Sequence, residues 1–485
     1  MKIALFGSFC GLLLAVFTTK AQNNLQFDAS KYETQTQDFN GKTIKVRAYE
    51  KVIYVANPVD LIHHILNIYI PEEYFTGGTI NGYSAENAPI FFPNRVGGYM
   101  PAVPATFVVP EQKGGFPYNN KTVLTALSKG YIVASAGARG RINKNEKGEF
   151  TGKAPAGIVD LKAAVRYLKF NDKLMAGDAN KIISNGTSAG GAMSTLLGAT
   201  GNHPDYDPYL KALGAANATD NIFAVSAYCP ITNLENADMA YEWQLNKIHT
   251  YNFRGKAGEL NAESIKVSDD LKAAFPNYIN GLNLKNDSDK RLSLDAEGNG
   301  NFKDLVKLYI VASAQKAIDA GMDLSKHSFL KIEIDASNRA KVLSVDYDAY
   351  MIYLERMKTP PAFDALDNKS FENNLFGTVS IDNQHFTTYA STHSKDLKAT
   401  MANKQTIKMM NPMNYIGDKQ AKTAKNWRIR HGAKDKDTGF AISVILATML
   451  KNKGYQANLE LPWDKPHSGD YDLEELFNWA DGICK

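Results

Sequence analysis

The sequence is poor in cysteine and has almost no excess of either charge. Only three of its 485 residues are cysteine, too few for a disulfide-bonded scaffold. The 55 basic and 51 acidic side chains leave a formal charge of +4, which is weak for a chain of this length. We therefore expect no nucleic acid partner, because such partners require a concentrated positive surface. The hydrophobic share of 44% excludes a disordered chain and allows a large buried core.

Long apolar runs are missing after the N-terminus. Residues 3–17 form one apolar run between Lys2 and the ending Thr19-Lys20-Ala21, which is the layout of a cleavable secretory signal over residues 1–21. No later segment approaches the ~20 apolar residues that a membrane helix needs. We therefore expect a secreted or periplasmic protein without a stable membrane anchor.

Removal of residues 1–21 leaves two cysteines, Cys229 and Cys484. An oxidising compartment would allow them to form a disulfide. The alternative is that Cys229 is simply a buried residue at the end of a strand. The sequence leaves both this pairing and the oligomeric state open.

Strand-like and helical patterns alternate along most of the chain. Leu66, Ile68 and Ile70 alternate with other residues, which predicts an antiparallel edge strand with one solvated face. Further strand-like runs lie at 90–92, 131–134, 181–184, 222–228, 427–430 and 457–461, and helical patterns lie at 158–168, 440–450 and 473–479. Because strand–helix–strand repeats imply parallel strands, we expect an α/β fold with a mostly parallel central sheet.

Residues 231–425 interrupt this alternation. They are richer in Asn, Asp and Lys and contain long helical patterns such as 302–320. We interpret this segment as a large, mainly helical lid domain inserted into one α/β core. The core then consists of residues 22–230 and 426–485.

A turn of small residues joins the strand at 181–184 to a helical run at 192–197. It reads Gly186-Thr187-Ser188-Ala189-Gly190, and this context is typical of a nucleophile elbow, in which small neighbours leave the serine hydroxyl clear of the sheet. Ser188 is then a nucleophile, and the Ala189 N–H can stabilise an oxyanion. A glycine-rich turn with a structural serine is the alternative. Asn185 begins a formal glycosylation sequon, but a glycan would block the elbow, so a bacterial origin fits better.

A serine nucleophile needs a histidine base. Seven histidines follow Ser188, and His431 stands directly after the predicted strand at 427–430. His467 lies instead in the loop between the last predicted strand and the last predicted helix, where the base of an α/β-hydrolase is found. We therefore select His467, with a polar surface histidine as the alternative.

The acid and the second oxyanion donor are expected in loops after other strands. Asp435 and Asp437 both follow the strand at 427–430, and their spacing does not separate them. Gly97 and Gly98 follow the strand at 90–92, and a glycine pair allows a backbone N–H to approach a reacting oxygen closely.

Together these motifs resemble the bacterial tannases (tannin acyl hydrolases), which are esterases of the α/β-hydrolase superfamily. The resemblance covers most of residues 45–485 and is most specific at residues 185–191, 227–232, 237–243 and 467–472. It implies that Asp435 is the triad acid and that Asp437 joins Lys358 and Glu372 in holding galloyl hydroxyls. From the residues alone, Lys358 and Glu372 are equally consistent with charges on a solvated face.

We therefore expect a secreted serine esterase that hydrolyses plant-derived phenolic esters, chiefly galloyl ester or depside bonds, through an acyl-enzyme. No cofactor or metal is expected, because the one calcium-like loop, which starts at Asp295, has Val306 where glutamate is needed. The first alternative is a feruloyl or acetyl esterase that acts on plant polysaccharide. A serine peptidase or a binding protein without catalysis is less consistent with a complete triad and no peptide-binding domain before the elbow.

Overall fold

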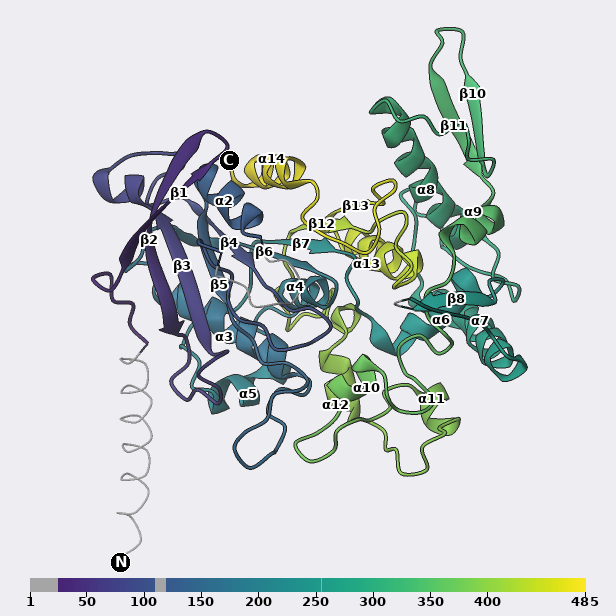
Figure 1. The fold of residues 1–485 in the computed structure, drawn as a ribbon, viewed down its shortest axis with the longest axis horizontal. Helices are drawn as coiled ribbons and strands as arrows, with labels where there is room; N and C mark the ends of the chain where they lie inside the picture. Colours follow the sequence, from purple (N-terminus) through teal and green to yellow (C-terminus); the bar gives the residue numbers. More distant parts are fainter. Residues whose placement is uncertain (1–24, 110–118, 254) are drawn as a thin grey trace, which may run out of the picture.

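A nine-stranded sheet runs through the centre of the protein in the order β1-β2-β3-β5-β4-β6-β7-β12-β13 (Figure 1). The computed structural model describes residues 25–109, 119–253 and 255–485, so the predicted signal at residues 1–21 lies outside the described residues. The strands are β1 (Glu33–Phe39), β2 (Lys42–Ile53), β3 (Ile65–Pro71), β4 (Pro89–Pro93), β5 (Ile132–Ala136), β6 (Asp178–Thr187), β7 (Ala224–Tyr228), β12 (Asn426–Arg430) and β13 (Gln456–Glu460). Pairing is antiparallel from β1 to β5 and parallel from β5 to β13. The predicted fold class is confirmed.

The predicted solvated face of β3 is wrong. The strand is antiparallel to both neighbours, but Asn67 is 5% exposed and Tyr69 is 0% exposed. The Asn67 amide accepts from Lys51 N at 2.9 Å and donates to Ala105 O at 3.1 Å. The polar residue in the alternation is therefore a buried and fully bonded group, which a hydropathy pattern does not distinguish from a solvated one.

Helices cover the sheet and pack closely on it. Those of the core are α2 (Lys121–Ser128), α3 (Ala156–Phe170), α4 (Ala189–Ala199), α5 (Asp207–Ala212), α13 (Phe440–Asn452) and α14 (Leu473–Cys484). A Cβ on Gly198 of α4 would collide with Val225 of β7 and Trp427 of β12. Glycine therefore brings α4, and with it the elbow at its start, close to these strands.

Between β7 and β12 the chain leaves the sheet and forms a large insertion. It contains α6 (Leu234–Leu245), β8 (Thr250–Phe253), β9 (Lys256–Glu259), α7 (Ala262–Leu282), α8 (Asn301–Asp319), β10 (Leu330–Ile334), β11 (Ala340–Val345), α9 (Tyr347–Leu354), α10 (Phe371–Leu375), α11 (Thr388–Thr392) and α12 (Lys404–Met409). The insertion is mainly helical, as expected, but the β8–β9 and β10–β11 hairpins were not predicted. Figure 1 shows β10 and β11 projecting away from the sheet, and about half of their residues are exposed.

The boundaries of a separate lid domain at residues 231 and 425 stay a prediction.

Among the described residues, no helix is both long enough and apolar enough to cross a membrane.

Candidate active site

Ser188 occupies the turn between β6 and α4 with a φ of 61°. This conformation is unfavourable for a residue with a side chain, and the surrounding backbone maintains it. Ser188 N donates to Tyr228 O at 3.0 Å, and Ser188 O accepts from Ile231 N at 3.2 Å. A Cβ on Gly186 would collide with the Gly190 carbonyl, so the turn admits only glycine there. The geometry is that of a nucleophile elbow.

His467 contacts Asp435 and not Asp437. The distance from His467 Nδ1 to Asp435 Oδ2 is 2.8 Å, and Asp437 N donates to Asp435 Oδ1 at 2.8 Å. Asp435 is 0% exposed, whereas the His467 side chain is 24% exposed. The buried His431 adds a second ring, with Nε2 at 3.7 Å from Asp435 Oδ2. The structure thus separates the two aspartates that sequence spacing left equivalent.

Charge sets the protonation of this pair. Burial by itself would lower the pKa of His467, but the Asp435 carboxylate outweighs burial and raises this pKa above its ordinary value. Burial by itself would raise the pKa of Asp435, and His467 and His431 together hold it below its ordinary value. The carboxylate is therefore ionised and favours a positive imidazole beside it.

The loop that carries His467 is attached directly to the elbow. A Cβ on Gly469 would collide with the Thr187 side chain, so only glycine permits this approach. The Asp470 carboxylate accepts from Asn185 Nδ2 at 2.9 Å. These contacts hold the histidine loop next to Ser188.

A cavity of about 590 Å³ connects the elbow at Ser188 with the loop that carries His467. Its walls include Ser188, Ala189, His467, Gly98, Tyr99, Lys358, Glu372 and Asp437. His467 Nε2 is buried and, within the described residues, has no hydrogen-bond partner. This nitrogen is therefore available to act as the base for Ser188.

What we call the charged wall consists of three charged side chains that line the cavity, namely Lys358, Glu372 and Asp437. Lys358 Nζ lies 2.6 Å from Asp437 Oδ1 and 4.0 Å from the centre of the Phe363 ring. Glu372 of α10 is 8% exposed, and burial raises its pKa, while Lys358 acts in the opposite direction. The interpretation of Lys358 and Glu372 as charges on a solvated face is therefore wrong.

Two of the predicted oxyanion donors, Ala189 and Gly98, line the same cavity as Ser188. Ala189 is the first residue of α4, where helix N–H groups have no partner within the helix. The Gly97 carbonyl closes a turn by accepting from Met100 N at 3.0 Å. Gly98 is favoured over Gly97 because Gly98 lines the cavity.

Cys229 is a neighbour of Asp435 and His467 that sequence reasoning did not place there. Cys229 and Cys484 are both free and buried, so the possible disulfide does not form. Potential ligand atoms of Cys229, Asp435 and His467 all lie within 4.8 Å of one another. Burial raises the pKa of the Cys229 thiol, which keeps it neutral. The position of Cys229 directly after β7 could have predicted this, because the carboxyl ends of the neighbouring parallel strands β6, β7 and β12 meet at one edge of the sheet.

Comparison with known proteins agrees with this geometry. Residues 106–280 match the BD-FAE family, and the fold is that of the α/β-hydrolases, so the protein is a carboxylic ester hydrolase. The tannin acyl hydrolase of Lactobacillus plantarum superposes with a TM-score of 0.90 at 46% identity, over 96% of this chain and 99% of that chain. Fusobacterium nucleatum tannase gives 0.89 at 50% identity, over 95% and 99%. The chain therefore belongs to the bacterial tannase family.

A tannin acyl hydrolase in complex with ethyl gallate is also similar, with a TM-score of 0.89 and 46% identity over 96% of this chain and 99% of that chain. No curated protein sequence matches the chain.

Proposed function

We propose that the protein hydrolyses galloyl ester and depside bonds through an acyl-enzyme on Ser188. One observation carries this proposal: buried Glu372 and the Lys358–Asp437 pair line the same cavity as Ser188 and His467. The similarity to a tannin acyl hydrolase in complex with ethyl gallate supports the same substrate class.

In the proposed mechanism, Ser188 Oγ attacks the ester carbonyl while His467 Nε2 accepts the hydroxyl proton. The N–H groups at Ala189 and at Gly98 or Gly97 stabilise the negative oxygen of the tetrahedral intermediate. As this intermediate collapses, His467 returns the proton to the leaving alcohol, and the acyl group stays on Ser188. Water, deprotonated by the same imidazole, then attacks the acyl carbon. As the bond to Ser188 Oγ breaks, the imidazolium returns the proton to this oxygen and the carboxylic acid leaves, while Asp435 holds Nδ1 throughout.

The charged wall accounts for the choice of acyl group. Phenolic hydroxyls donate to carboxylates such as Glu372 and Asp437, and the Lys358 ammonium donates to a phenolic oxygen. A ring without hydroxyls would leave buried Glu372 without the donor that the substrate supplies, at about 1–3 kcal/mol for a neutral group and more for a charged one. The pocket therefore selects by penalising a missing hydroxyl.

The test compares kcat/KM for methyl gallate, methyl benzoate and methyl ferulate, with 4-nitrophenyl acetate as a reference for the bare esterase. We expect gallate to exceed benzoate by at least about 100-fold, within the range that hydrogen-bonding sites achieve. Equal rates on gallate and benzoate would remove the galloyl proposal. A preference for ferulate would favour the feruloyl esterase alternative.

We also propose that the protein is exported, on the basis of the signal-like residues 1–21. Cell fractionation of the native host and N-terminal sequencing of the purified protein test this. A mature chain that begins near Gln22 is expected, and an intact cytoplasmic chain would contradict it.

A further inference from the structure

Arg141 joins two walls of the cavity and is not one of the described residues that line it. Its Nε donates to Gly98 O at 2.9 Å. Its Nη1 donates to Asn374 Oδ1 at 3.0 Å, and the guanidinium lies 4.6 Å from the centre of the Phe371 ring. Asn374 and Phe371 belong to α10, which also carries Glu372. One side chain therefore holds both the predicted oxyanion loop and the helix of the charged wall.

The contact with Gly98 restricts the residue that carries the candidate donor. Arg141 Nε fixes the Gly98 carbonyl, and the Gly98 N–H is attached to the same Cα. Because the two planar peptide units around a residue turn only about φ and ψ, a fixed carbonyl limits the direction in which the Gly98 N–H points. The Arg141 N–H also donates to Tyr99 O at 2.9 Å, and a Cβ on Gly140 would collide with the backbone at Met100. The loop is thus held by both the backbone and the side chain of the Arg141 segment.

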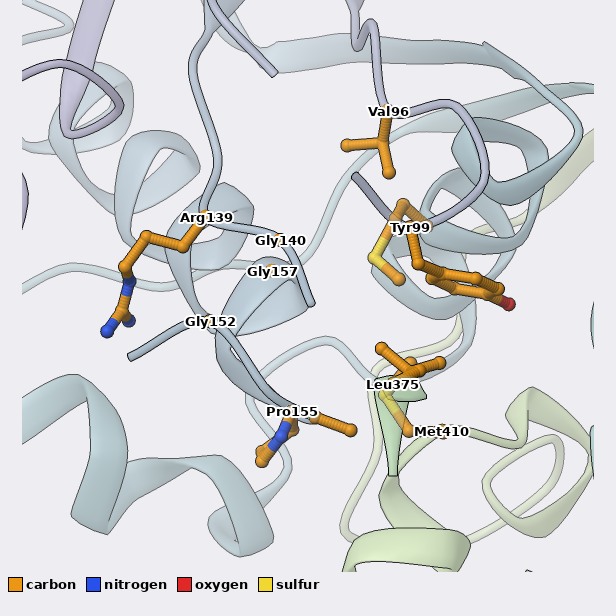
Figure 2. A pocket seen from close by; sticks show the side chains of 11 residues that line it. Val96, Tyr99, Arg139, Gly140, Gly152, Pro155, Gly157, Leu375 and Met410 are labelled. Atoms are coloured by element: carbon orange, nitrogen blue, oxygen red, sulfur yellow. The ribbon is translucent and has the colours of Figure 1, made fainter. Parts of the chain in front are cut away.

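Close packing behind this loop limits independent movement. Figure 2 shows Val96 and Tyr99 from the loop facing Leu375 of α10 and Met410 across a small void. Its volume is about 10 Å³, barely enough for one water molecule. The loop and α10 therefore pack against each other through apolar side chains, and Arg141 adds the polar contact that reaches Gly98 itself.

We propose that Arg141 is a positioning residue that keeps Gly98, whose N–H is the candidate oxyanion donor, in register with α10. Alignment of the oxyanion donor and binding of the ring at Glu372 then depend on one guanidinium. This role deepens the proposed function, because it assumes that Ser188 forms an oxyanion near Gly98. Lysine cannot replace arginine here, since a single ammonium lacks the fork that reaches two acceptors.

The test substitutes Arg141→Gln in the full chain and measures kcat and KM for 4-nitrophenyl acetate and for methyl gallate. Loss of a single oxyanion donor costs about 10²–10³ in kcat, so a misaligned donor should cost at least about tenfold on both esters. KM for the acetate should stay within about threefold, because this ester does not need the charged wall. A kcat within about twofold of wild type on the acetate would overturn the proposal.

Lys153→Gln is the matched control. Lys153 Nζ donates to Asn374 O at 2.7 Å and to Asp382 Oδ1 at 3.0 Å, so it anchors the same helix from a position away from Gly98. We expect this variant to raise KM for methyl gallate and to leave kcat on the acetate within about twofold. Equal kcat losses in the Lys153 and Arg141 variants would show general loosening of α10 and would overturn the role at Gly98.

Arg141→Lys covers the case in which Arg141→Gln fails to fold. It keeps the charge and most of the length, and we expect its kcat on the acetate to stay at least about fivefold below wild type despite an unchanged Tm. Full kcat in this variant would overturn the proposal. The acetate also separates the two hypotheses. A wild type without gallate preference contradicts the galloyl function alone, whereas a normal acetate kcat in the Arg141 variants contradicts the positioning role alone.

Discussion

The two walls of the cavity are built in different ways. On one side, Ser188, Asp435 and His467 stand in loops that follow strands of one sheet, and backbone hydrogen bonds hold Ser188 and Asp435. On the other side, Lys358 and Glu372 come from the insertion, in an irregular segment and a five-residue helix. The first wall depends on sheet topology, whereas the second depends on individual side-chain contacts.

Because of this difference, we expect the two walls to tolerate different substitutions. The loops after β6 and β12 should keep their places when one side chain is removed, because these strands pair on both sides. The His467 loop follows the edge strand β13 and is held in addition by its contacts with the elbow at Thr187 and Asn185. The charged wall has no such support, and Lys358 is held by its ion pair with Asp437 and by the Phe363 ring. Chemistry should therefore be lost by changes at the sheet, and substrate choice by changes at the insertion.

The largest expected effect is on the sheet side. Ser188→Ala and His467→Ala should each lower kcat by about 10⁶ on every ester, because nucleophile and base act as a unit. The double variant should be scarcely worse than either single one. Steady-state kinetics with methyl gallate and 4-nitrophenyl acetate, alongside Tm to confirm folding, check this. Clearly additive losses, or an active Ser188→Ala protein, would contradict the roles of Ser188 as nucleophile and His467 as base.

A smaller effect is expected where the two walls meet, at the neighbouring aspartates. Asp435→Asn should lower kcat by roughly three to four orders of magnitude, because the imidazole loses its orienting partner and correct tautomer. Asp437→Asn is the matched control and should leave kcat on 4-nitrophenyl acetate close to wild type. A larger loss on this acetate for Asp437→Asn would reverse the two assignments.

The insertion side should change selectivity by about two orders of magnitude. Glu372→Ala and Lys358→Ala should reduce the ~100-fold advantage of methyl gallate over methyl benzoate to less than about tenfold. Activity on 4-nitrophenyl acetate should survive both changes. Lys369, which lines the same cavity outside the charged wall, provides the control Lys369→Ala. If this control lost as much selectivity, recognition would reside in the general charge of the cavity.

The smallest expected effect is a displacement of the pH profile. His467 must be neutral to accept a proton, and Asp435 raises its pKa above the ordinary value of about 6.5. The kcat/KM for 4-nitrophenyl acetate should therefore fall as the pH drops through a pKa above 6.5. In Asp435→Asn the residual activity should show this limb at lower pH, since the raising charge is gone. An unmoved limb would mean that another group controls it.

Sequence reasoning predicted a triad because its candidate members follow the ends of strands. The glycines around Ser188 and the loop position of His467 are properties of local sequence, and the structure brings both residues to one cavity. Asp435 and Asp437 stand two residues apart in one loop, and spacing did not separate them. Burial and a 2.8 Å contact with His467 distinguish Asp435, because packing decides which way each side chain of a loop points.

Other residues were beyond the reach of pattern alone. Arg141 belongs to no motif, and its contacts with Gly98 and Asn374 join segments 43 and 233 positions away along the chain. The β10–β11 hairpin was missed although β10 alternates apolar and charged residues, because the whole insertion was interpreted as mainly helical.

By itself, the sequence determined the alternation of strands and helices, the small-residue turn at Ser188 and the loop that carries His467. These features arise from local propensity and from hydrophobic periodicity, which act over a few residues. Only the tertiary structure decided that Asn67 is buried, that Cys229 and Cys484 do not pair, that Asp435 contacts His467 and that Lys358 contacts Asp437. Each of these depends on segments distant in sequence, and their meeting is set by how the whole core packs.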